Sequence, residues 1–192
     1  MDRLWLRSVE NLNFVDPASF LVRLRHLEIE VALSDADPKV KALRTNSLKV
    51  SREQREAALF CHGIGKRIGA KVWFAHKEDQ DYDFVASWVT HEERHFAAVQ
   101  LKEVVPIETN PKASIQDLVQ NLGKYPDSNG LTVAIHLNQA GRFEPNLLEI
   151  PKLNIGSLWV FGSAELDQSR WLLWGNFTEN DPYGTQFFYP ET

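Results

Sequence analysis

The chain has only one cysteine, Cys61, among its 192 residues. A single cysteine excludes an internal disulfide framework and fits a reducing compartment, so we expect a cytoplasmic protein. Cys61 lies in a stretch of helical character, which favours a buried thiol over a nucleophile. The sequence also lacks any apolar run of about 18 residues and opens without signal-peptide features, so we expect neither a membrane span nor membrane binding.

Positive charge is scarce overall but unevenly placed. The formal net charge of −5 argues mildly against a nucleic-acid partner. Between residues 39 and 71, however, nine Lys or Arg stand against two acids, whereas from residue 139 onward three basic residues stand against seven acids. This distribution is compatible with one phosphate-binding face, and equally with a solvated helix surface. Nucleic-acid contacts on such a face would come from Arg52, Arg55, Lys66, Arg67 and Lys71.

Local patterns predict a core of helices and strands over residues 51–138. Ser51 and Gln54 form a capping box, which predicts a helix from about Arg52 to Ile68 with Gly69 as its stop. Ser114 is expected to cap a second helix that ends near Lys124. Apolar runs predict strands at 71–75, 83–89, 95–105 and 131–137. A helical crossover before the last strand favours an α/β fold with a mixed sheet.

The segments on either side of this core are expected to complete a single domain of residues 1–192. Residues 1–50 read as an N-terminal helical extension, with Asp16-Pro17 as a helix start. Residues 27–33 alternate like a strand, so helix and strand both stay open there. Residues 139–192 are expected to add aromatic strands at 158–161 and 171–177. Their aromatic side chains could form a homodimer surface, although core packing explains them equally well.

Three residues with ligand chemistry follow one another across a predicted hairpin. If the turn is the four residues His91 to Arg94, opposed residues have numbers that sum to 185, so Asp83 lies opposite Lys102. Gln100 is then on the diagonal and on the same face as Lys102. A two-residue slip in register keeps the three side chains together, whereas a one-residue slip separates Asp83 from the pair. We therefore expect a carboxylate, an amide and an ammonium group to converge on one face.

This arrangement resembles the PD-(D/E)xK nuclease superfamily, the restriction endonuclease-like fold, over residues 51–138. That family runs helix, three strands, helix, strand, with an acid on the second strand and (D/E/Q)-x-K on the third. The resemblance implies an Mg²⁺- or Mn²⁺-dependent nuclease acting on DNA, with the metal held by Asp83, Gln100 and the backbone carbonyl of Leu101. It implies that Lys102 stabilises developing negative charge, and that Glu56, or Glu53 on nearly the same helix face, completes the site.

Two alternatives remain open. Gln100 stands where the family more often has an acid, and a neutral amide weakens cation binding. The protein could therefore be a degenerate nuclease-fold module that binds nucleic acid or a protein partner without cutting. The second alternative is a zinc metalloprotease, because His91, Glu92 and His95 fit the H-E-x-x-H motif. That chemistry needs a helix, and the neighbouring residues favour a charged turn between strands instead.

Overall fold

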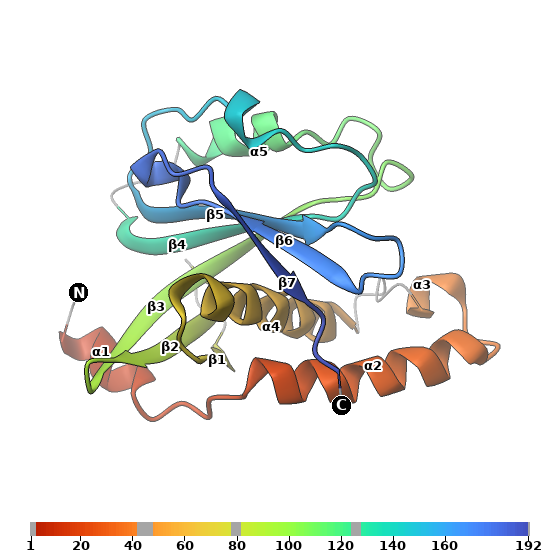
Figure 1. Cartoon of the computed structure of the whole chain (residues 1–192), viewed down its shortest axis with the longest axis horizontal. Coiled ribbons are helices and arrows are strands. Elements are labelled where there is room, and N and C mark those ends of the chain that lie inside the picture. Colours follow the sequence, from red (N-terminus) through yellow and green to blue (C-terminus); the bar gives the residue numbers. More distant parts are fainter. Residues whose placement is uncertain (1–2, 42–47, 78–81, 124–127, 192) are drawn as a thin grey trace.

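The computed structural model describes residues 3–41, 48–77, 82–123 and 128–191 (Figure 1). Within these residues the strands form a single seven-stranded sheet whose spatial order follows the sequence, from β1 to β7. The strands are β1 (Val72–His76), β2 (Phe84–Thr90), β3 (Glu93–Val104), β4 (Ser128–Leu137), β5 (Ile155–Ser163), β6 (Arg170–Trp174) and β7 (Gly184–Phe188).

Strand direction changes along the sheet. The strands β1, β2 and β3 pair antiparallel, β3 pairs parallel with β4, and β4 pairs parallel with β5. The last strands, β6 and β7, are antiparallel to their neighbours. The expected mixed sheet is confirmed, and β3, β4 and β5 end at the same edge because they run in the same direction. β7 was not predicted, whereas the strands predicted at 158–161 and 171–177 correspond to β5 and β6.

Helices cover both faces of the sheet. The helix α4 (Lys49–Ile68) lies on one face with α2 (Pro17–Leu33), and α5 (Ile115–Leu122) lies on the other (Figure 1). The short helix α1 (Arg3–Val9) belongs to the α5 side, since Val9 packs in the same cluster as Val119 and Leu122. The helix α3 (Pro38–Lys41) follows α2. No helix among the described residues is both long enough and apolar enough to cross a membrane.

The helix α2 settles the open assignment of residues 27–33, which are helical. Asp16 is its N-cap, and Asp16 Oδ1 accepts a hydrogen bond from the backbone N–H of Ala18 at 3.1 Å. Between α1 and α2 the chain crosses the edge of the sheet, where Val15 forms an isolated bridge with Phe74 of β1. The N-terminal helices therefore pack on both faces of the sheet.

The helix α4 begins earlier than predicted. Its N-cap is Leu48, which makes no side-chain capping bond, so the predicted Ser51 cap is wrong. The helix gains a first turn in which Lys49 and Glu53 pair across i,i+4 at 3.3 Å. Its end is as predicted, with Gly69 in the left-handed conformation (φ 67°). Ser114 caps α5 as predicted and accepts from the Asp117 N–H, while the predicted end at Lys124 lies outside the described residues.

Small residues let α4 approach the sheet closely. Its buried face includes Glu56, Ala57, Ala58 and Gly63. A Cβ on Gly63 would stand 2.8 Å from the ring of Phe187 in β7, a distance that no ordinary carbon contact allows. This close packing places the middle of α4 directly over the sheet, and it holds Glu56 among core residues.

The β2–β3 hairpin has a two-residue turn instead of the predicted four-residue turn. Thr90 pairs with Glu93, and His91 and Glu92 both have positive φ angles, 50° and 67°. Two positive φ angles define a type I′ turn, whose twist matches that of the flanking strands. Opposed residues therefore sum to 183, with Phe84 opposite Val99, and the register predicted from the longer turn is wrong by two residues.

Candidate metal site

Asp83 lies at the start of the β2–β3 pair. Its backbone N–H donates to the Val99 carbonyl at 3.0 Å, and its Oδ2 accepts from the backbone N–H of Leu101 at 2.7 Å. The carboxylate therefore caps the end of the ladder. Asp83 also borders a narrow space under α4, together with Glu53 and the side chains of the first core cluster.

Gln100 and Lys102 lie on the opposite side of the sheet from α4. They pair in register with Val133 and Ile135 of β4, and both of those residues belong to the core cluster under α5. Leu101 between them belongs to the cluster under α4. The two-residue slip alone would keep the three side chains together, but Asp83 and Phe84 both meet Val99, so the regular alternation ends before Asp83. Asp83 therefore lies next to Glu53 and the Leu101 backbone, whereas the Gln100 and Lys102 side chains do not reach that space.

A different set of ligand-type side chains does converge on the α4 side. Glu56 of α4, Glu103 of β3 and His136 of β4 each offer one ligand atom, and these atoms all lie within 4.8 Å of one another. Within the described residues, this is the group of His, Cys, Asp or Glu side chains that lies close enough together to hold one metal ion. Two carboxylate oxygens and one imidazole nitrogen are a donor set that divalent transition metals accept, with Mn²⁺ and Zn²⁺ suited to the mixture.

The parallel pairing of β3 and β4 explains this meeting. Glu103 is the register partner of His136, so the two side chains stand side by side on one face. Both residues come near the carboxyl ends of their strands, and Glu56 reaches them from the helix packed above. In open α/β sheets, ligands bind in the crevice outside the carboxyl ends of the strands.

Hydrogen bonds orient the three side chains. His136 Nδ1 lies 3.2 Å from Glu56 Oε1, and the side chains of both residues are about 5% exposed. In the tautomer whose Nδ1 carries the proton, this contact is a hydrogen bond to the carboxylate, and Nε2 then keeps a lone pair for a metal. The ring of His136 also stacks on Phe161 with centroids 5.0 Å apart. The Asn138 side chain donates to Glu103 Oε1 at 2.7 Å, so each potential ligand is held by a neighbour.

A cavity of about 580 Å³ opens beside this group. Its wall includes Glu56, His136 and Asn138. The rest of the wall comes from α2, α4, the chain after β3 and the β5–β6 connection. A neighbouring cavity of about 460 Å³ follows the carboxyl ends of β3, β4 and β5 and shares His136 and Asn138. The two cavities give solvent and small molecules a way to the buried Glu56–His136 pair.

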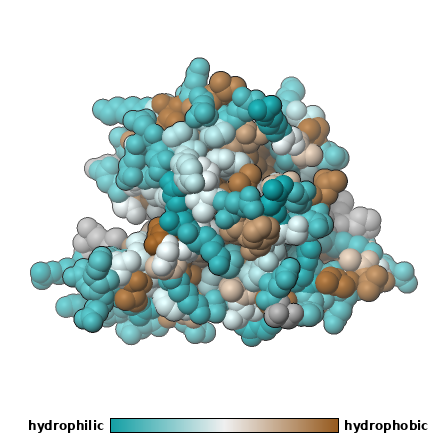
Figure 2. Space-filling view, viewed as in Figure 1, coloured by the Kyte–Doolittle hydropathy of each residue, from teal (hydrophilic) through white to brown (hydrophobic). Residues whose placement is uncertain are grey.

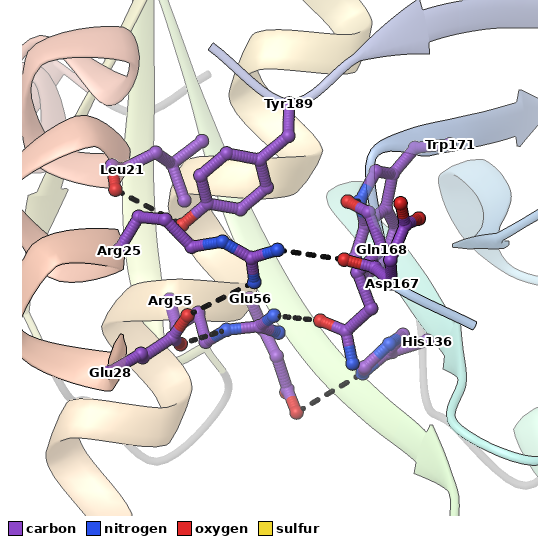
Figure 3. Close-up of polar contacts among 10 residues, drawn as sticks. All are labelled: Leu21, Arg25, Glu28, Arg55, Glu56, His136, Asp167, Gln168, Trp171 and Tyr189. Atoms are coloured by element: carbon purple, nitrogen blue, oxygen red, sulfur yellow. Dashed lines mark hydrogen bonds and ion pairs between the residues drawn. The ribbon is translucent and has the colours of Figure 1, made fainter. Parts of the chain in front are cut away.

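Basic side chains line the larger cavity. Arg25, Lys41, Arg52 and Arg55 contribute to its wall. Figure 3 shows Glu28 lying between two of these arginines, 3.6 Å from Arg25 and 2.8 Å from Arg55. The guanidinium groups of Arg25 and Arg55 also reach across to the β5–β6 connection, where they bond the Asp167 carbonyl and the Gln168 side chain. The guanidinium groups of Arg25 and Arg55 are therefore held in fixed positions by acceptors on both sides.

Two further contacts fix this wall. Tyr189, after β7, donates its hydroxyl to the Leu21 carbonyl at 3.0 Å, and burial, helped by the carboxylate of Glu28, raises the pKa of Tyr189 to about 12. Hydrogen bonds from the backbone and the hydroxyl of Ser169 lower the pKa of Asp167 and so keep its carboxylate ionised. Tyr189 is thus held to α2 by its bond to Leu21, and the β5–β6 connection is held to α2 by the bond from Arg25 to the Asp167 carbonyl.

The predicted nucleic-acid contacts fall into two groups at opposite ends of α4. Arg52 and Arg55 line the cavity, whereas Lys66 and Arg67 lie about 20 Å away along the helix, at 1.5 Å per residue, and Lys71 follows just after the helix ends. Arg67 bonds Asp181, the Gly175 carbonyl and Thr185, and Lys71 pairs with Asp16 at 2.8 Å. Only the first group shares a surface with the Glu56–Glu103–His136 group.

The H-E-x-x-H residues do not lie on a helix. His91 and Glu92 form the turn, and His95 is within β3, where its ring stacks on Trp88 at 5.4 Å. Two histidines placed in this way do not share the helix face that the zincin motif requires. The predicted turn is confirmed, whereas its predicted length of four residues is wrong, because the turn has two residues.

Sequence reasoning selected Glu56 and missed its two companions. Glu103 directly follows Lys102, and His136 stands inside the apolar run of β4. A polar residue near the end of a buried parallel strand was the available signal for His136. Comparisons with protein-family models, curated proteins and solved structures found no match to this chain. The chemistry of the site must therefore be argued from its own residues.

Proposed function

We propose that the protein is a metal-dependent nuclease that hydrolyses phosphodiester bonds, with DNA as its substrate. The observation that carries this proposal is the convergence of Glu56, Glu103 and His136 beside a cavity whose wall holds Glu56, His136 and arginine side chains. Metal ligands beside fixed positive charges suit a substrate whose reacting group is an anionic phosphate.

The donor set fits a divalent cation. A ligand–metal distance of about 2.0–2.1 Å allows donor atoms up to about 4.2 Å apart, so the observed span of 4.8 Å or less requires only a small contraction. The imidazole favours Mn²⁺ over Mg²⁺, which prefers oxygen ligands. When bound, the cation would supply Lewis acidity toward the phosphate and lower the pKa of a nucleophilic water.

The chain's own residues supply orientation and charge. Glu56 fixes the His136 ring, and Asn138 fixes the Glu103 carboxylate. Arg52 and Arg55 face the same cavity and can neutralise the charge that develops on the phosphate oxygens. The leaving oxygen requires a proton, which solvent in the adjoining cavity can provide. In this proposal Lys102 has no direct role, because it faces the other side of the sheet.

The order of elements also supports the proposed relationship to the PD-(D/E)xK superfamily. The run α4, β1, β2, β3, α5, β4 has the sequence of elements of the restriction endonuclease-like fold. The proposed ligand set differs from the family pattern, since it keeps the helix glutamate and replaces the hairpin residues by Glu103 and His136. We treat the family assignment as part of the proposal.

A second candidate is a nuclease-fold module that binds nucleic acid or a protein partner without cutting. The position of Gln100 and Lys102 favours it, because their side chains are on the α5 side while Asp83 borders the space under α4. If the family motif were required for activity, this arrangement would leave the protein inactive.

One assay separates these possibilities. The purified protein is given Mn²⁺ or Mg²⁺ with bis(4-nitrophenyl) phosphate and with mixed DNA substrates. We expect hydrolysis with Mn²⁺, and a loss of about 100-fold or more in Glu103→Gln, because a charged metal ligand becomes a neutral amide. Glu53→Gln is the matched control, since Glu53 lies on the same helix and pairs with Lys49 instead.

The variant Lys102→Ala distinguishes the Glu56–Glu103–His136 site from the family motif that contains Lys102. Activity that survives this change and is lost in Glu103→Gln supports the proposed site. Loss of activity in Lys102→Ala with Glu103→Gln unaffected would assign the chemistry to the family motif. Absence of hydrolysis with either metal, in protein that is folded by circular dichroism, would favour the binding module.

A further inference from the structure

We propose that the larger cavity admits one nucleotide unit of a single strand and excludes intact duplex. The inference rests on the proposed function, and it defines the substrate class of the same site. In this arrangement the phosphate lies by Glu56, Glu103 and His136, and the base lies against Ile29 and Leu166 at the mouth.

The ligands are recessed. Glu56 and His136 are each only 4% exposed, so a cation bound to them lies below the molecular surface. A scissile phosphate must come into direct contact with that cation. The cavity of about 580 Å³ is of the size that holds one small molecule, and a single nucleotide fits that size. A phosphate held in the backbone of an intact duplex would have to reach the recessed ligands together with the rest of the helix, which is far larger than such a pocket.

The cavity carries charge suited to one phosphate group. Arg52 and Arg55 project into it from the first turns of α4. The Arg55 side chain is 11% exposed, bonds Glu28 and Gln168, and lies over the Trp171 ring at 5.7 Å. Its position is fixed before any ligand arrives, so little ordering is needed on binding.

Exposed apolar side chains stand on two sides of the mouth. Ile29 of α2 is 52% exposed and Leu166 of the β5–β6 connection is 98% exposed, and both line the same cavity. Figure 2 shows apolar side chains gathered over the C-terminal half of α2. Apolar residues that face water across the mouth of a charged cavity suit a flat, apolar ring such as a nucleobase. Paired bases in a duplex are stacked and do not present such a ring.

The experiment compares four substrates with Mn²⁺: a single-stranded oligonucleotide, the same sequence as a blunt duplex, a covalently closed circular duplex, and bis(4-nitrophenyl) phosphate. Binding of the first two is also measured by fluorescence anisotropy with Glu103→Gln. We expect the single strand to be cut and bound at least tenfold better than the duplex, and the closed circle to stay intact.

The rim is tested with the double variant Ile29→Ser, Leu166→Ser. We expect it to raise KM for the single strand five- to tenfold. Leu147→Ser is the matched control, because Leu147 is 72% exposed and lies in the short 3₁₀ turn Pro145–Leu147, outside the cavity wall.

The outcomes are distinct. Equal cutting of duplex and single strand, or a rim variant that behaves like Leu147→Ser, overturns this inference and leaves the proposed function standing, provided that bis(4-nitrophenyl) phosphate is still hydrolysed. Failure to hydrolyse any substrate overturns the proposed function, and this inference with it.

Discussion

Substituting Glu103 should change the stability of the protein in opposite senses with and without metal. Ligand oxygens of Glu56 and Glu103 lie no more than 4.8 Å apart, and two unit negative charges at that distance repel each other by about 3 kcal/mol at an effective dielectric constant of about 20. Hydrogen bonds from His136 and Asn138 offset part of this repulsion. Glu103→Gln removes the charge but keeps an oxygen that can accept from Asn138. In EDTA, the variant should therefore be at least as stable as the wild type.

Bound metal should make the wild type more stable than Glu103→Gln. A cation that binds only the folded state, at 100 times its Kd, stabilises that state by about 2.7 kcal/mol. For a chain of this size, 1 kcal/mol corresponds to about 2–4 °C in Tm, so Mn²⁺ should raise the wild-type Tm by about 5–10 °C. Glu103→Gln should lose most of this rise, because one of three protein ligands no longer carries a charge.

Differential scanning fluorimetry with a Mn²⁺ titration, and with EDTA as the reference, measures both effects. Glu53→Gln is the control and should keep the full Mn²⁺ response. The reasoning fails if Glu103→Gln melts well below the wild type in EDTA and still responds to Mn²⁺. That result would make Glu103 a structural partner of Asn138, with no part in binding a cation.

Three other properties can be checked directly. Cys61 is fully buried and burial raises the pKa of its thiol, so maleimide labelling at pH 8, followed by mass spectrometry, should be negligible until the protein is unfolded. Phe161→Ala should destabilise the protein by about 3–5 kcal/mol in urea denaturation, since this core ring packs against Phe60 and His136; a smaller loss would mean that the core closes around the cavity. Burial lowers the pKa of His62 in the folded state, so folding favours its neutral form and stability is lost as pH falls through the unfolded-state value of about 6.5. Between pH 7 and pH 5 the wild type should therefore lose more stability than His62→Gln, and equal losses would contradict this interpretation.

Local signals in the sequence predicted two helix ends correctly, but they did not predict the hairpin turn. Gly69 ends α4 and Ser114 begins α5 because each residue's chemistry is nearly sufficient for its position. The hairpin turn was misjudged because His91 and Glu92 adopt positive φ angles, which residues with a Cβ seldom do. The twist of the two strands outweighs that local preference, and twist is a property of the paired strands that neither residue reveals.

The candidate site was only partly predictable because the sequence of β3 does not distinguish its two faces. Val99 and Leu101 share one face with Glu103, whereas Gln100 and Lys102 share the other with Val104. Each face thus carries apolar and polar residues, and the alternation alone does not say which face meets α4. A one-residue change of phase exchanges the two sets. The choice is made by pairing with β4, which is distant in sequence and brings His136 beside Glu103.

The cavity draws on every part of the chain that the sequence divided into extension, core and added strands. Glu28 comes from the N-terminal helices, Glu56 and His136 from the central segment, and Gln168 from the C-terminal strands. The proposed metal ligands all belong to the central segment, whereas Ile29 and Leu166 at the mouth belong to the flanking ones. In the proposed function, chemistry and access are therefore encoded in different segments, so changes in the flanking segments should alter which phosphoester reaches the site without touching the groups proposed to cleave it.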